Sequence, residues 1–352
     1  MRRLHLGLGW MCLGVFLSCA GSKATNRDSC PIGAETCACT TGGSCDPGLA
    51  CLSNICVNPN SNHGGGGSGA GNTSSTTTTT GTGGSQNCHP EGCQAIDVVF
   101  ALDGSGSMME EISALSAAQA FTQITGVLAG VNCGNIQYRI GVTDDNDGGW
   151  KQVGGAPWFD SQQMTQSEIA SAFAAAAAQV SAGSGTDPGC EHVLTSAKNL
   201  LVNDATGFLR PDAILVLVLV TDVDDYGAYD QLGGNTCGIG CTTPPPPLNT
   251  TYDALLALKG NDPKGLATVV VAGDPNVNNG VNFCGQPGSC GCNGLDCGVF
   301  HADRLFSFAG MLQGSNGYFG NLCSGAASVP TDVQAAFANN INLACQTYIP
   351  PN

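Results

Sequence analysis

Four apolar segments, each of strand length and rich in β-branched residues, limit what this chain can fold into. They span residues 95–102, 136–142, 213–220 and 266–272. Such uninterrupted runs are typical of strands that are buried on both faces of a sheet. Segments with the length and apolar spacing of helices lie at 112–128, 167–180, 191–202, 252–259, 302–312 and 333–343. Buried strands that alternate with helices predict an α/β fold with a doubly wound, mostly parallel sheet, to which we assign six strands.

The first 19 residues have the pattern of an export signal. Arg2 and Arg3 precede an apolar run at 6–17, which is shorter than the ~20 residues of a membrane-spanning helix. Ser18 before Cys19 resembles a bacterial lipobox, in which Cys19 becomes the lipidated N-terminus; ordinary cleavage after Ala20 is the alternative. We expect a lipoprotein of the bacterial outer membrane or cell surface, or a secreted protein if Cys19 is not lipidated.

Two accessory segments separate this signal from the main domain. Residues 28–57 contain six cysteines and almost no aliphatic core, so this small module can hold a fold only through cross-links, whose connectivity stays open. Zinc is the alternative, although the segment has no histidine. Residues 58–87 are mostly Gly, Ser, Thr and Asn, which predicts a flexible linker. The main domain then occupies residues 88–348.

Cysteine content and charge restrict the compartment and the partners. The chain has 20 cysteines, which indicates an oxidising compartment and excludes a routine cytosolic enzyme. Twelve of them lie between Cys88 and Cys345; the group at 284–297 could hold zinc, but its irregular spacing favours disulfides. With 11 Lys and Arg against 27 Asp and Glu, the net charge of −16 argues against nucleic-acid binding and favours cations or basic partners.

A group of oxygen-bearing side chains follows two of the predicted strands. Asp103, Ser105 and Ser107 follow the first strand in the pattern Asp-x-Ser-x-Ser, and Asp222 follows the strand at 213–220. Ligands of doubly wound sheets bind beyond the carboxyl ends of the strands, where both aspartates belong. The alternative is that the serines cap a helix and Asp222 only ends its strand.

The chemistry of this group favours a hard cation. Carboxylate and hydroxyl oxygens suit Mg²⁺, with Ca²⁺ or Mn²⁺ possible in a looser site, whereas the absence of thiolate and imidazole argues against zinc. If one carboxylate reaches the cation only through water, much of its charge stays unquenched. An aspartate or glutamate of a partner protein could then occupy an open coordination position.

These motifs resemble the von Willebrand factor A (vWA) domain family and its metal-ion-dependent adhesion site. Thr186 stands where the family has its coordinating threonine. The resemblance covers residues 95–347 and implies a Rossmann-like fold with a divalent cation that binds a protein ligand. The metal ligands that it implies are Asp103, Ser105, Ser107, Thr186 and Asp222. Segments at 207–213 and 222–225 are similar to cysteine-rich vWA lipoproteins of myxobacteria.

Further carboxylates follow the second and third of the apolar strands. They are Asp144, Asp145 and Asp147, and Asp224 and Asp225. We interpret both groups as solvated loop carboxylates; a network around the metal ligands or an extra cation site is the alternative. Asp187 is a weaker candidate ligand beside Thr186.

The sequence favours a binding protein over an enzyme. It has neither a His-Glu-x-x-His run nor a phosphate-binding Gly-x-x-x-x-Gly-Lys loop. Our main hypothesis is a lipid-anchored surface protein that binds a protein ligand through the cation and meets the membrane only through its anchor. The alternatives are a disulfide-hardened envelope scaffold, or a metal-assisted hydrolase that uses His192, which we interpret instead as a solvent-facing helix residue.

Overall fold

The structure is a computed structural model of the chain and describes residues 50–52, 55–57, 89, 91–134, 136–183, 191–225, 246–279, 288–290 and 298–351. The chain divides into two units, Met1–Ser75 and Thr76–Asn352. In the first unit, β1 (Ala50–Leu52) and β2 (Ile55–Val57) pair antiparallel and set Cys51 opposite Cys56. The predicted signal with Cys19, the linker at 58–87 and the remainder of the cysteine-rich module lie outside the described residues.

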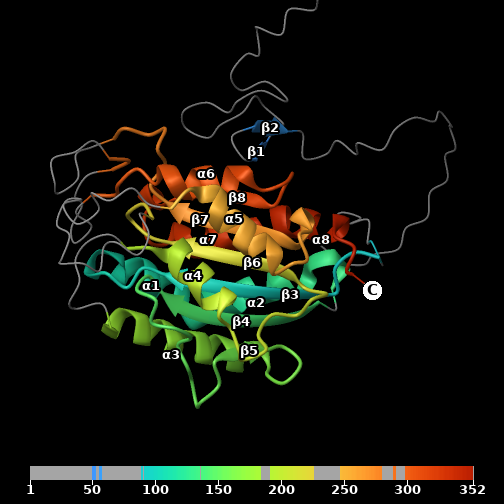
Figure 1. Cartoon of the computed structure of the whole chain (residues 1–352). Coiled ribbons are helices and arrows are strands. Elements are labelled where there is room, and N and C mark those ends of the chain that lie inside the picture. Colours follow the sequence, from blue (N-terminus) through green and yellow to red (C-terminus); the bar gives the residue numbers. More distant parts are fainter. Residues whose placement is uncertain are drawn as a thin grey trace, which may run out of the picture. The chain divides into compact units, whose positions relative to one another are not determined.

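The second unit is built on a six-stranded sheet (Figure 1). Its strands are β3 (Ala95–Leu102), β4 (Gln137–Asp144), β5 (Trp158–Asp160), β6 (Ile214–Val220), β7 (Leu266–Ala272) and β8 (Gly317–Asn321). They lie in the order β5-β4-β3-β6-β7-β8, and every neighbouring pair is parallel except β4 and β5. The predicted doubly wound, mostly parallel α/β sheet is confirmed.

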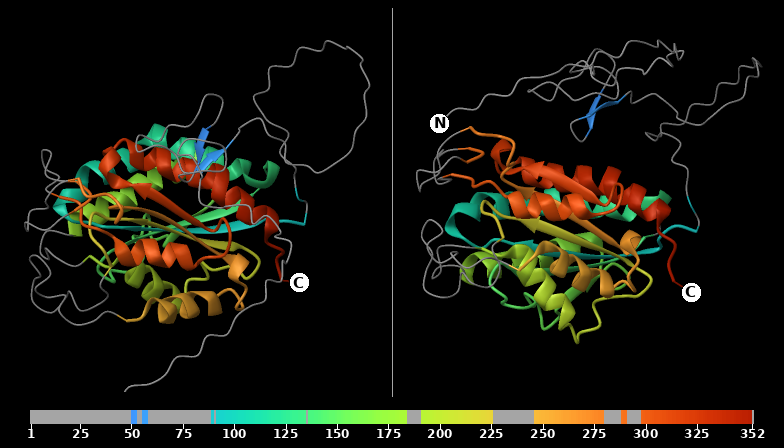
Figure 2. Two further views of the ribbon diagram at one scale, coloured as in Figure 1. Left: turned by 90° about the horizontal axis from the view of Figure 1, so that it is seen from above. Right: turned by 45° about the horizontal axis from the view of Figure 1, so that its top comes forward.

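Helices cover both faces of this sheet (Figure 2). They are α1 (Met109–Ser116), α2 (Ala118–Gly130), α3 (Gln166–Gly183), α4 (Val193–Val202), α5 (Leu248–Ala257), α6 (Asp303–Met311), α7 (Ser328–Ala336) and α8 (Asn342–Thr347). Side chains of α1, α2, α3, α7 and α8 share one apolar core with the sheet, and those of α4, α5 and α6 share the other. The layers explain why the central strands read as continuous apolar runs.

The side chains of the central strand β6 contribute to both apolar cores. Its seven residues alternate between β-branched side chains at 214, 216, 218 and 220 and leucines at 215, 217 and 219. Because successive side chains of a strand point to opposite faces, the β-branched set joins the first core and the leucines join the second. Every residue of the strand is buried, so neither face is open to water.

Two of the predicted helices are interrupted. The segment at 112–128 breaks at Ala117, whose extended backbone (φ −56°, ψ 125°) separates α1 from α2. The segment at 333–343 contains the end of α7, a π-helical turn at Phe337–Ile341 and the start of α8. Within the described residues no single helix is long and apolar enough to cross a membrane, although 106–116 and 118–133, bent by 63°, together pass that test of length and composition.

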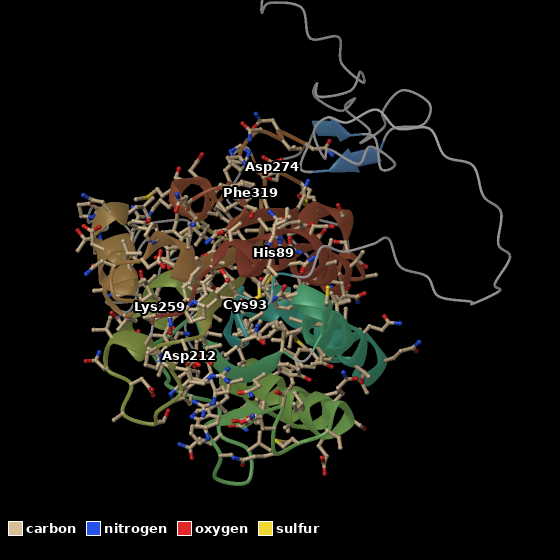
Figure 3. The ribbon with its side chains drawn as sticks, turned by 90° about the vertical axis from the view of Figure 1, so that its right-hand side faces the viewer. His89, Cys93, Asp212, Lys259, Asp274 and Phe319 are labelled. Carbon is tan, nitrogen blue, oxygen red and sulfur yellow. A yellow bond between two sulfur atoms is a disulfide. The ribbon has the colours of Figure 1, made fainter. Side chains whose placement is uncertain are left out.

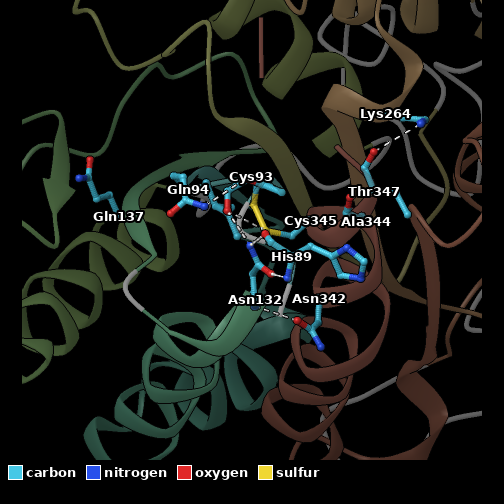
Figure 4. Close-up of a disulfide and its surroundings, with 12 residues drawn as sticks. His89, Cys93, Gln94, Asn132, Gln137, Lys264, Asn342, Ala344, Cys345 and Thr347 are labelled. Atoms are coloured by element: carbon cyan, nitrogen blue, oxygen red, sulfur yellow. Dashed lines mark hydrogen bonds between the residues drawn. A yellow bond between two sulfur atoms is a disulfide. The ribbon is translucent and has the colours of Figure 1, made fainter. Parts of the chain in front are cut away.

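A disulfide joins the two ends of this domain. Cys93, just before β3, is bonded to Cys345 in α8 (Figure 4). Around it, the Cys93 N–H donates to the Cys345 carbonyl oxygen (2.9 Å), and the Asn132 N–H donates to Asn342 Oδ1 (2.9 Å). The bond therefore sits in a hydrogen-bonded frame that holds the last helix against the start of the first core strand.

A second disulfide includes one of the cysteines clustered at 284–297. Cys290 is bonded to Cys323, which lies outside the cluster at 284–297. The prediction of disulfides is thus confirmed for Cys290, whereas its three neighbours in the cluster lie outside the described residues. Cys133 is disulfide-bonded as well.

We expect the bond between Cys93 and Cys345 to contribute more stability than the one between Cys290 and Cys323. The first closes a loop of sequence separation 252 and the second one of 33, and a longer loop loses more entropy when it is closed in the unfolded chain. Replacing the first pair with alanine should lower the free energy of unfolding by about 2–5 kcal/mol, and by roughly 1–2 kcal/mol more than replacing the second. Denaturant unfolding under non-reducing conditions measures both; equal losses would contradict the prediction.

Candidate metal centre

The pairing of the central strands brings the two predicted aspartates together. Leu102 at the end of β3 lies opposite Val220 at the end of β6, so the next residues of both strands meet at one edge of the sheet. The Asp103 N–H continues the ladder by donating to the Val220 carbonyl oxygen (3.0 Å). Asp103 and Asp222 are both buried there.

Hydrogen bonds fix the Asp103 carboxylate in place. One oxygen accepts the Ser105 N–H (2.8 Å), and the other accepts the Thr221 hydroxyl (2.8 Å). The hydroxyl oxygens of Ser105 and Ser107 lie 2.9 Å apart in the turn that leads into α1. Neither the short 3₁₀ turn that starts after Ser105 nor α1 has a side-chain cap, so helix capping does not explain these serines.

Asp222 completes the group that the structure brings together. Its pKa lies well above the ordinary value, first because the carboxyl is buried and second because Asp103 carries a like charge beside it. A hydrogen bond from the Ser107 side chain acts in the opposite direction. Asp103, Ser105, Ser107 and Asp222 therefore form one cluster, whereas Thr186 lies outside the described residues.

Two further carboxylates belong to this cluster. Asp145 and Glu191 are buried. One carboxylate oxygen from each of them and one from Asp103 all lie within 4.8 Å of one another. Asp145 Oδ1 accepts the Gly104 N–H (3.0 Å), and the Asp145 carbonyl oxygen accepts the His192 N–H (3.2 Å). The interpretation of Asp145 as a solvated loop carboxylate is wrong, because the residue is buried.

Glu191 was not among the predicted site residues, although the sequence holds a signal for it. It stands at the start of the segment predicted as a helix at 191–202, two residues before α4 begins at Val193. In a doubly wound sheet the helices start near the carboxyl ends of the strands, so a glutamate in this position belongs at the same edge as Asp103.

The predictions for three neighbouring residues are also wrong, because all three are buried. Asp225 accepts the Thr195 N–H and hydroxyl (2.7 Å each), and Asp224 accepts the N–H groups of residues 304 and 305 at the start of α6 (2.9 and 3.1 Å). His192 has no exposed surface, and its Nε2 lies 3.4 Å from Asp147 Oδ2. These groups form a supporting network next to the cluster.

We call Asp103, Asp145, Glu191 and Asp222 the acidic cluster. A different charged group lies at the opposite end of the sheet. There the buried Asp97 carboxylate binds the N–H and guanidinium of Arg210 (2.7 and 2.8 Å). The buried Lys259, labelled in Figure 3, donates to the carbonyl oxygens of Arg210 and Pro211. Among the ion pairs of the described residues, none joins a basic side chain to a carboxylate of the acidic cluster.

Burial and mutual repulsion raise the pKa values in this cluster. Burial, and then the charge of Asp103, raise the pKa of Asp145 to about 7 and that of Glu191 to about 10. Burial also raises the pKa of Asp103. A bound cation is the partner that would stabilise all of these carboxylates in their charged form. Because the donors are carboxylate and hydroxyl oxygens, the cluster fits a hard divalent cation.

Comparison with models of protein families finds no match, and neither does comparison with curated proteins. Similar solved structures include proximal thread matrix protein 1 from mussel byssus, with 14% identity over 70% of this chain and 48% of that chain and a TM-score of 0.35. The pilus adhesin SpaC from Lactobacillus rhamnosus GG has 12% identity over 70% of this chain and 30% of that chain, with a TM-score of 0.35. The manganese-loaded TRAP protein of Plasmodium vivax has 13% identity over 67% of this chain and 72% of that chain, with a TM-score of 0.31. This chain spans about half of the first protein and under a third of the second.

In the absence of divalent cations, we expect the protein to lose stability as the pH rises. The pKa of Asp145 is about 7 in the folded state against an ordinary 3.8, so the folded state holds a proton that the unfolded state has released. This contribution is fully present below about pH 4 and is lost as the pH rises through about 7. The melting temperature of chelated protein should therefore be higher at about pH 5 than at about pH 8, with a smaller difference in Asp145→Asn.

Added Mg²⁺ or Ca²⁺ should raise the melting temperature most at the higher pH, where the carboxylates are charged and no proton competes with the cation. A chelated protein that gains stability over this interval, or an Asp145→Asn variant with an unchanged pH profile, would contradict the assignment of Asp145 to the cluster.

Proposed function

We propose that this chain is an exported surface protein, anchored through a lipid on Cys19, whose main domain binds a divalent cation and through it a protein ligand. One observation carries the proposal. Asp103, Ser105, Ser107 and Asp222, which come from two distant parts of the sequence, meet at the carboxyl edge of the sheet in a cluster that no described ion pair neutralises.

Each residue has a distinct part in the proposed site. Asp103 and Asp222 supply negative charge, Ser105 and Ser107 supply neutral oxygens, and Thr186 is the fifth ligand that the resemblance to vWA domains implies. We propose Mg²⁺ as the cation, with Ca²⁺ or Mn²⁺ as the alternatives. Its positive charge would be within reach of an Asp or Glu of a partner. Thr221 holds Asp103 in position through its hydroxyl.

The proposal is for a binding protein without catalytic activity. A metal-assisted hydrolase built on this site would need His192 to exchange protons with a substrate. Its ring is buried and its Nε2 faces Asp147, which supports a structural part for this histidine. We likewise propose no contact with nucleic acid, in keeping with the net charge of −16.

An envelope scaffold is the second candidate, and the disulfides favour it. The bond between Cys93 and Cys345 ties both ends of the domain together, as would suit a rigid platform. In that case the cation would stabilise the fold, and surfaces away from Asp103 would carry the interactions.

Asp103→Asn should abolish cation binding, because it removes the buried charge at the centre of the cluster. Thr221→Val should weaken binding by about 10–100-fold, since it removes a hydrogen bond that orients a ligand and leaves the ligand itself in place. Glu110→Gln, which changes an exposed carboxylate in α1, is the matched control and should bind as the unchanged chain does. Isothermal titration calorimetry with Mg²⁺ and Ca²⁺ measures all three.

The same variants separate the two candidate functions. Proteins from a cell-surface extract that bind the immobilised chain in Mg²⁺, and leave it on chelation, should fail to bind Asp103→Asn. If Asp103→Asn loses the cation and keeps every partner, the scaffold is the correct function and the adhesion proposal is wrong.

The lipid anchor has its own test. Bacteria that express the full chain and grow on a clickable palmitate analogue should label it, and the label should disappear in Cys19→Ala because the acyl chain is attached at that residue. Cys12→Ala, which changes the other cysteine of the signal, is the control and should keep the label. Labelling that survives Cys19→Ala would show that Cys19 is not the lipidated residue.

A further inference from the structure

We infer that the carboxyl edge of the sheet binds a second divalent cation, held by Asp103, Asp145 and Glu191. The inference deepens the proposed function and rests on it, because Asp103 would serve both cations. The first cation would lie on the Asp222 side of Asp103 and the second on the Asp145 side.

Strand order places Asp103 between the two sites. In the sheet, β3 lies between β4 and β6, and Leu102 pairs with Asp144 on one side and with Val220 on the other. The residues that follow each strand end therefore flank Asp103, with Asp145 on one side and Asp222 on the other. A carboxylate has two oxygens and can bridge two cations, which lie about 3.5–4 Å apart in two-metal sites.

An unsatisfied oxygen points to a ligand on the Asp145 side. Glu191 is only 6% exposed, and its Oε2 has no hydrogen-bond partner among the described residues. A buried polar oxygen without a partner is unfavourable, and a cation at this point would supply the missing partner. Glu191 lies close enough to Asp103 and Asp145 for one cation to reach an oxygen of each.

Main-chain hydrogen bonds hold together the segments that carry these three carboxylates. The Gly104 N–H, next to Asp103, donates to Asp145 Oδ1 (3.0 Å), and the His192 N–H, next to Glu191, donates to the Asp145 carbonyl oxygen (3.2 Å). Three separate chain segments are thus fixed around one point, which is the arrangement that a site of oxygen ligands requires.

The number of charges gives a functional reason for the second cation. Asp103, Asp145, Asp222 and Glu191 carry four negative charges when ionised, and a single divalent cation offsets only two of them. The two that remain would repel the carboxylate of a partner protein. Two cations neutralise the four carboxylates and allow an acidic partner to approach an open coordination position.

Mn²⁺ binding to the full mature chain tests the inference, by equilibrium dialysis and by electron paramagnetic resonance. We expect two Mn²⁺ per chain, with a spectrum broadened by coupling between neighbouring ions. Glu191→Gln and Asp222→Asn should each bind one, with the spectrum of an isolated ion, and the exposed control Glu110→Gln should bind two. Circular dichroism checks that each variant folds, and Asp145→Asn replaces Glu191→Gln if the latter does not.

The variants distinguish failure of this inference from failure of the proposed function. One ion that is lost in Asp222→Asn and kept in Glu191→Gln overturns the second site and leaves the proposed function intact. One ion that is lost in Glu191→Gln and kept in Asp222→Asn overturns the proposed site at Asp222 and, with it, the inference of two cations. Absence of Mn²⁺ binding overturns both, and an uncoupled wild-type spectrum with two bound ions overturns the bridge through Asp103.

Discussion

The parallel pairing of β3 with both β4 and β6 determines where this domain concentrates its charge. Parallel strands end at the same edge, so residues that are more than a hundred positions apart in the chain, such as Asp103 and Asp222, become neighbours. Helices on both faces remove water from the strands themselves. The carboxylates that follow the strands consequently meet in a buried place, where their repulsion is not screened by solvent.

The two ends of the sheet deal with buried charge in different ways. At one end, Asp97 has Arg210 as a permanent partner, and Lys259 is satisfied by main-chain oxygens. At the other, the hydrogen bonds that reach Asp103 and Asp145 come from N–H groups and hydroxyls, which orient the carboxylates and leave their charge in place. The first arrangement neutralises its carboxylate with a basic side chain of the chain itself, whereas no ion pair of the described residues does so in the second.

The sequence was informative wherever burial on both faces left an uninterrupted pattern. Residues 95–102 and 266–272 are strands with the predicted bounds, and the other two apolar runs differ by at most two residues at an end. The edge strands β5 and β8 were not located, because they are short, lie partly exposed and include two glycines in β8. The break at Ala117 has no sequence signal such as Pro or Gly.

At the site, the structure brings Asp103, Ser105, Ser107 and Asp222 together, and their role as metal ligands stays a prediction. The solvated interpretation of Asp145 was wrong for a physical reason: the sequence does not show which segment packs over an acidic residue that follows a strand. That cover comes from the start of α4, through the bond between His192 and Asp145. Burial of this kind depends on tertiary packing, which cannot be predicted from the spacing of residues along the sequence.

The disulfide between Cys93 and Cys345 has a mechanical consequence. A pull applied to the chain before Cys93 and after Cys345 passes from one sulfur to the other and leaves the loop between them, of sequence separation 252, without load. The sheet would feel tension when the load enters between these two cysteines, as it would through something bound at the carboxyl edge. Tension along the backbone and tension through the acidic cluster are therefore separate in this domain, and the second acts on the strands that carry Asp103 and Asp222.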